Sequence, residues 1–219
     1  MKAPAGQRSQ TPEPRLKRPY SPRKRFQITV LPVYAAFNLE FIGRPRETIR
    51  GFGAGLEVDL QIFDFLWIRA QGSHTVHPVE DQFVQENEDE PSIQVARAGM
   101  ITGSNAGLSL VYAMDLGRFV PLIDAGLGTL FITTPEGIQD GQMGGACRSD
   151  GSCDMGLTCG SDDVCRMGVV PEAHLGLGLD VLIRQRLSVG AQVRYHALLR
   201  DPAVFPIYLT GAVRLALRF

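Results

Sequence analysis

The sequence predicts an all-β chain that forms an eight-stranded, antiparallel, up-and-down transmembrane β-barrel. Two observations predict it. From residue 26 onward, apolar segments recur in which alternate residues belong to two chemical classes, and this period of two is typical of strands. These segments are about 10 to 13 residues long, which suits a tilted strand that crosses a bilayer better than a soluble strand of about 5 to 6 residues.

The composition agrees with this class. A length of 219 residues allows one sizeable domain, and 24 glycines, mostly inside the alternating segments, favour a curved and closely packed β structure. The net charge of -1 argues against a nucleic-acid partner. No run approaches the ~18 to 20 consecutive apolar residues of a membrane helix, which excludes a helical membrane protein and leaves a membrane barrel open.

The first 25 residues differ from the rest of the chain. They hold Pro, Gln and Ser together with eight Lys or Arg residues and one acidic residue, and no apolar stripe. Such a composition cannot bury a core, so residues 1–25 are expected to form a disordered basic tail. The tail also lacks the apolar run of about 7 to 15 residues that marks a secretory signal.

The barrel is expected to span residues 26–219. The connections between its strands alternate between long and short, as expected when one rim lies in a confined space and the other can carry long loops. The expected strands are residues 31–41, 50–62, 66–76, 105–115, 119–133, 170–183, 187–199 and 205–219.

The two faces of these strands differ in chemistry. One face is nearly free of charge, and in the first strand it holds Leu31, Val33, Ala35 and Phe37. The other face combines many glycines with charged residues, a pattern that suits a narrow barrel interior better than a water-facing sheet. We therefore expect the apolar face to contact lipid and the charges to pair in the lumen. The predicted lumen network comprises Glu57, Asp59, Arg69, Asp124, Asp180, Arg194 and Arg214.

The cysteines all lie in one connection, residues 134–168, at Cys147, Cys153, Cys159 and Cys165. An even number of cysteines in a Gly-, Asp- and Ser-rich segment predicts a disulfide-stapled extracellular loop, which needs an oxidising compartment. A four-cysteine zinc site usually contains close C-x2-4-C pairs, which are absent here. The spacing leaves all three disulfide pairings open. Export is implied, although residues 1–25 contain no recognisable signal.

The final strand, "YLTGAVRLALRF", ends the chain on an aromatic residue, Phe219. With the short turns and long opposite loops, it makes the chain from about Phe26 onward resemble the small eight-stranded outer-membrane β-barrels of Gram-negative bacteria, of the outer-membrane protein A and W type. The resemblance implies residence in the bacterial outer membrane, contact with its lipid, and a terminal strand that the barrel-assembly machinery reads as its signal. The Cys-rich loop has no counterpart in the familiar members.

No pattern predicts a catalytic residue, a cofactor or a metal site. His174 and His196 fall on the predicted lumen face, near Asp180 or Arg194, and are interpreted as members of its polar network. The local candidates for a lipid-modifying enzyme are weak, because no glycine motif for an oxyanion hole accompanies them. They are Ser73, His74, Thr75 and His77. The acidic connection, residues 78–91, lacks the D-x-D-x-D-G spacing of a calcium loop and is expected to be a solvated outer loop.

These observations together favour a non-enzymatic outer-membrane barrel with an envelope structural or surface-interaction role. It would display its acidic and Cys-rich loops to an unidentified extracellular partner. Three alternatives remain: a narrow, porin-like channel for small solutes, a lipid-modifying outer-membrane enzyme, and a soluble lipocalin-like barrel that binds a ligand.

Overall fold

The structure is a computed structural model that describes residues 26–38, 48–84, 92–137, 139–154, 157–184, 186–199 and 207–219. The predicted basic tail and residues 85–91 of the acidic connection lie outside these residues. Within the described part of the chain, no helix is both long and apolar enough to span a membrane.

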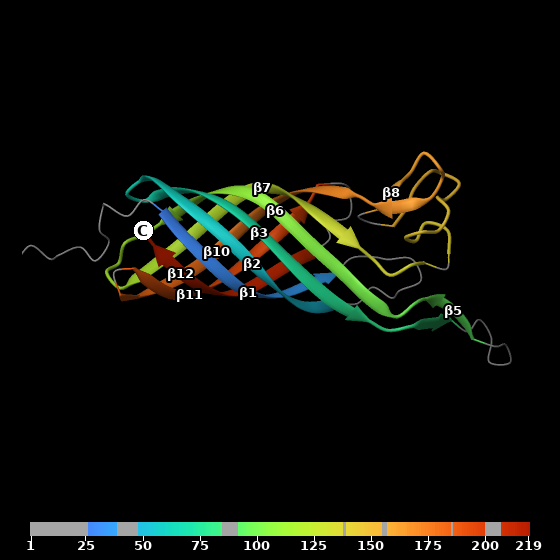
Figure 1. Ribbon diagram of the computed structural model, residues 1–219, viewed down its shortest axis with the longest axis horizontal. Coiled ribbons are helices and arrows are strands. Elements are labelled where there is room, and N and C mark those ends of the chain that lie inside the picture. Colours follow the sequence, from blue (N-terminus) through green and yellow to red (C-terminus); the bar gives the residue numbers. More distant parts are fainter. Residues whose placement is uncertain are drawn as a thin grey trace, which may run out of the picture.

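Eight antiparallel strands form one closed barrel, which confirms the predicted all-β architecture (Figure 1). Each strand pairs with its neighbours in the chain, and the first and last close the ring, with Val30 opposite Leu215 and Phe37 opposite Tyr208. The barrel strands are β1 (Phe26–Asn38), β2 (Ile49–Phe63), β3 (Leu66–Val79), β6 (Gly99–Ala113), β7 (Phe119–Thr133), β10 (Val169–Arg184), β11 (Leu187–Leu198) and β12 (Ile207–Arg218).

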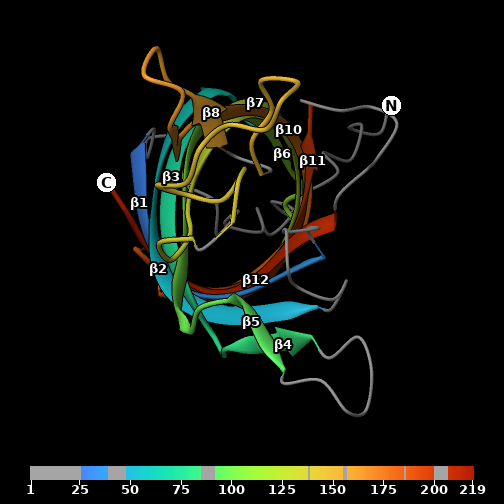
Figure 2. The ribbon, with the colours of Figure 1, turned by 90° about the vertical axis from the view of Figure 1, so that its right-hand side faces the viewer.

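Two small hairpins that the sequence did not predict extend from one rim of the barrel (Figure 1). One pairs β4 (Gln82–Val84) with β5 (Ile93–Ala96), between β3 and β6. The other pairs β8 (Leu157–Cys159) with β9 (Cys165–Met167), between β7 and β10. The C-terminus lies at the opposite rim, and the view along the barrel shows the β4–β5 hairpin outside the ring of strands (Figure 2). The molecule thus has a rim of short turns and a rim of long connections.

The outer surface of the barrel is apolar. Large aliphatic side chains stand exposed at alternate positions, for example Leu127 at 66% and Leu177 at 62%. Aromatic side chains gather towards the short-turn rim, where the ring of Phe65 lies 5.6 Å from that of Tyr112. A belt of this extent is far larger than the apolar patches of soluble monomers and matches the lipid-facing surface of a membrane barrel.

The prediction for the first strand was wrong. Leu31, Val33, Ala35 and Phe37 were expected to face lipid, but all four are buried inside the barrel. The alternate residues of β1 face outward instead, among them Val30, which is 50% exposed. Both faces of this strand are apolar, because its inner residues pack near the long-connection end of the lumen, which is apolar. A period of two separates two faces but does not say which one points inward.

Candidate functional site: the lumen and the cysteine-stapled loop

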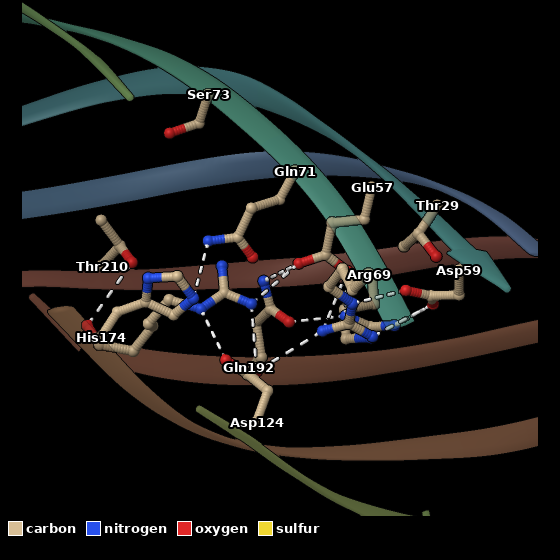
Figure 3. Close-up of polar contacts among 12 residues, drawn as sticks. Thr29, Glu57, Asp59, Arg69, Gln71, Ser73, Asp124, His174, Gln192 and Thr210 are labelled. Atoms are coloured by element: carbon tan, nitrogen blue, oxygen red, sulfur yellow. Dashed lines mark hydrogen bonds and ion pairs between the residues drawn. The ribbon is translucent and has the colours of Figure 1, made fainter. Parts of the chain in front are cut away.

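The centre of the lumen is organised around one carboxylate. Glu57 of β2 is fully buried and pairs with three guanidinium groups. Arg194 donates to Glu57 Oε1 at 3.0 Å, Arg69 Nη1 lies 3.3 Å from Oε2, and Arg214 Nη1 donates to the same oxygen. Figure 3 shows Glu57 and Arg69 reaching into the space between the strands. Residues from β2, β3, β11 and β12 are therefore joined at a single side chain.

Each arginine also has an aspartate partner. Arg69 donates to Asp59 from Nε at 2.6 Å and from Nη2 at 3.1 Å. Arg194 donates to Asp124 from Nε and from Nη2, both at 3.0 Å. Bidentate pairs of this kind fix both side chains and satisfy most of their hydrogen-bonding groups.

The third pair completes the network, because Arg214 donates from Nε to Asp180 at 2.9 Å. The structure thus brings all seven residues of the predicted lumen network into one connected cluster. Glycine makes room for it. A Cβ atom at Gly176 would lie 2.5 Å from the Asp124 carboxylate, so the pair of Asp124 and Arg194 needs glycine on the neighbouring strand.

Apolar clusters lie beyond this network at both ends of the lumen. Along β10, Val170 belongs to one cluster, Asp180 to the charged layer and Leu182 to the other cluster. Among the described residues, side chains therefore occupy the lumen at successive levels along the barrel. The short-turn cluster holds Trp67, Val111, Ala113, Val120, Leu122 and Leu182. The long-connection cluster holds Ala35, Phe37, Ile101, Leu130, Ile132, Val170, Leu198 and Tyr208.

A second polar group lies between the charged network and the long-connection cluster. His174 of β10 stands directly opposite His196 of β11, and Glu172 lies beside them on the same face of β10. Sequence reasoning placed both histidines in the lumen but did not connect Glu172 with them. The available signal was the spacing of two residues between Glu172 and His174, which puts both side chains on one face of a strand.

The structure separates Ser73 from His74. Ser73 points into the lumen and donates to Asn105 Oδ1 at 2.8 Å, whereas His74 points outward, with Nδ1 2.7 Å from Ser104 Oγ. Thr75 and His77 also point inward, and their side chains lie 3.0 Å apart. Consecutive strand residues face opposite sides, so Ser73 and His74 cannot act together as nucleophile and base.

Two disulfides staple the connection between β7 and β10, which confirms the predicted chemistry of the cysteines. They join Cys147 to Cys159 and Cys153 to Cys165, and the described residues include no free cysteine. The two bridges interlock along the chain, which selects one of the three pairings that the spacing left open. Gln142 of this loop donates to the Val95 carbonyl at 3.0 Å, so the loop also contacts the β4–β5 hairpin.

No protein-family model and no curated protein sequence matches the chain. Solved structures do. Neisserial surface protein A (NspA) is similar over 89% of this chain and 97% of its own, with 14% identity and a TM-score of 0.54. Ail, the attachment invasion locus protein of Yersinia pestis, solved with the heparin analogue sucrose octasulfate, is similar over 90% and 99%, with 12% identity and a TM-score of 0.47.

The N-terminal β-barrel domain of Pseudomonas aeruginosa OprF is similar over 90% of this chain and 100% of its own, with 10% identity and a TM-score of 0.48. The similarity to NspA, at 14% identity and a TM-score of 0.54, supports the fold alone. The chain is a closed, eight-stranded, antiparallel β-barrel, similar to NspA over nearly the whole length of both chains.

Proposed function

We propose that this chain resides in the bacterial outer membrane as a closed, non-enzymatic barrel that presents its long-connection rim for contacts at the cell surface. The presenting elements are the β4–β5 hairpin and the cysteine-stapled loop, residues 134–168. The β12 strand, with Phe219 at its end, is then the part that the barrel-assembly machinery reads.

The observation that carries the proposal is the contrast between the lumen and the rim. Buried ion pairs and apolar clusters occupy the lumen. An occupied lumen has little space through which a solute could pass. The rim instead carries a segment that two disulfides hold in one shape. An ordered loop loses less conformational entropy when it binds a partner, so such a loop is suited to recognition. NspA, which shares the fold, is itself described as a surface protein.

Surface display is tested by labelling the loop cysteines on intact cells. The chain contains four cysteines, all in this loop, so mild reduction followed by a membrane-impermeant biotin-maleimide labels it specifically. We expect strong labelling of intact cells. The matched control replaces all four cysteines with serine and adds Asp64→Cys in the turn between β2 and β3, which should react only after the outer membrane is permeabilised. The opposite pattern would invert the proposed orientation.

The closed lumen is tested separately in planar lipid bilayers. We expect the refolded protein to insert without conductance steps, because the charged layer and both apolar clusters block the lumen. Regular single-channel steps that change in size with Asp124→Arg would instead support the narrow-channel alternative.

A further inference from the structure

A buried group of three metal-ligating side chains lies in the lumen, outside the charged network. Glu172, His174 and His196 expose at most 4% of their surface. One potential ligand atom from each lies within 4.8 Å of the other two. Glu172 Oε2 is 3.0 Å from His196 Nδ1, and Glu172 Oε1 is 3.8 Å from His174 Nδ1. Each carboxylate oxygen thus faces a different imidazole nitrogen, at separations close to the spacing of about 3.3 Å between tetrahedral ligands that lie about 2.0 to 2.1 Å from a zinc ion.

Two of the atoms that face each other have no hydrogen-bond partner. They are Glu172 Oε1 and His174 Nδ1, and both are buried. A buried carboxylate oxygen and a buried imidazole nitrogen without partners are both costly, and their separation of 3.8 Å is too long for a direct hydrogen bond. A cation between them would satisfy both at once, because each offers a lone pair to the same point.

The outer nitrogen of each ring lies within hydrogen-bond distance of a neighbouring side chain. His196 Nε2 lies 3.1 Å from Thr210 Oγ1, which can accept a hydrogen bond from the Nε2–H group. His174 Nε2 lies 3.2 Å from the side-chain nitrogen of Gln71, whose Oε1 has no partner. Exchanging the two ends of that amide turns the contact into a bond from His174 Nε2 to the Gln71 oxygen and leaves Nδ1 free to bind a metal.

The neighbouring strand leaves room for the group. A Cβ atom at Gly126 would lie 2.6 Å from His174 Nε2, and one at Gly128 would lie 3.0 Å from Glu172 Oε1. Gln71 and Thr210 also line a cavity with space for about one water molecule. The site therefore offers three protein ligands in a space that glycines of β7 leave free of side chains.

We propose that Glu172, His174 and His196 bind one divalent transition-metal ion of the zinc type inside the lumen. Two imidazoles and a carboxylate suit zinc and similar ions better than calcium or magnesium, which prefer oxygen ligands throughout. The ion would join β10 and β11 through their side chains, in addition to the backbone ladder between them. This inference is independent of the proposed surface role.

The test measures metal bound to the refolded barrel. The oxidised chain, without an affinity tag, is refolded in detergent with Zn²⁺, freed of excess metal by gel filtration, and analysed by mass spectrometry for zinc per chain. We expect one ion per chain in the parent protein. Glu172→Gln and His196→Gln should each weaken binding at least tenfold. His74→Gln is the matched control, because His74 is exposed and lies outside the lumen, and it should keep the full amount.

A second measurement needs no variant, in case changes in the lumen prevent folding. X-ray absorption of the zinc-loaded parent should show nitrogen and oxygen neighbours that include two imidazoles, and no sulfur. Sulfur neighbours would place the ion at Cys147, Cys153 and Cys165, which lie close enough to bind metal if reduced, and would overturn the proposal. A folded, oxidised barrel that retains no zinc would also overturn it and leave the cluster as a polar network.

Discussion

At the scale of single residues, the lumen depends most on Glu57. It is the one described carboxylate that pairs with Arg69, Arg194 and Arg214 together, and it also accepts from Gln192 at 3.0 Å. A buried ion pair adds little net stability compared with a well-packed apolar replacement. Removing one partner, however, leaves the other charge buried without a counter-charge. The importance of Glu57 therefore lies in the three cations that it neutralises.

We expect Glu57→Gln to lower the free energy of unfolding by about 3 to 5 kcal/mol, the usual effect of removing one partner from a buried ion pair. The amide keeps the shape of the side chain but not its charge. Urea unfolding of the protein in detergent or lipid vesicles, followed by tryptophan fluorescence, measures the change through Trp67, the single tryptophan.

The matched control is Glu136→Gln, at an exposed carboxylate beyond the end of β7, which should change stability by less than about 0.5 kcal/mol. An equally small effect at Glu57 would mean that the three arginines are neutralised without it.

Sequence reasoning reached these residues unevenly. The alternation of glycine with charge placed the seven residues of the lumen network on one face, and the structure finds them together. It could not say that Glu57 is shared by three arginines, because partners are set by strand register and tilt. Glu172 was missed although its spacing of two residues from His174 puts both on one face of β10, whereas its contact with His196 depends on the β10–β11 register.

At the scale of elements, the number and order of the barrel strands could be predicted. The starts of β1 and β6, which begin at residues 26 and 99 and not at 31 and 105, the facing of β1 and the two rim hairpins could not. The prediction for β1 rested on the rule that the polar face points inward. That rule holds in the charged layer but fails where the lumen is apolar, around Phe37, whose ring lies 4.3 Å from that of His77. The hairpins are short and irregular in sequence, so a period of two does not reveal them.

The cysteine-stapled loop is expected to be a separate unit of stability. Its disulfides each join residues 12 positions apart and none reaches a barrel strand. A disulfide that closes a loop of about this length stabilises the folded loop by about 3 kcal/mol. Replacing Cys147 and Cys159 with serine should therefore make the loop much more sensitive to trypsin, which can cut after exposed Arg148 and Arg166, while the unfolding of the barrel stays unchanged.

Limited proteolysis with a gel readout separates the two effects, because the loop is cut into a nicked chain while the barrel core remains protected. The oxidised parent protein serves as the reference. Coupled loss of loop protection and barrel stability would show that the loop helps to hold the rim together, through contacts such as that between Gln142 and Val95.

At the scale of the whole molecule, closure of the ring and the apolar exterior together predict a barrel that stays folded in detergent and is insoluble without it. Phe219 donates its backbone N–H to the Phe26 carbonyl at 2.9 Å, and Arg218 donates to Gln27 at 2.7 Å, so the last strand is fastened to the first along their common edge. A closed ring has no free strand edge that could pair with another chain, and every barrel strand is hydrogen-bonded on both sides.

We therefore expect the protein refolded in detergent to resist dodecyl sulfate at room temperature and to change its electrophoretic mobility only after boiling. Without detergent it should precipitate, because side chains such as Leu108, Leu127 and Leu177 form the exposed belt. Deleting β1, residues 26–38, should abolish the mobility shift by opening the ring between β2 and β12. A chain that is soluble in plain buffer and shows no shift would contradict an apolar exterior with the charges in the lumen. That result would favour the soluble ligand-binding barrel.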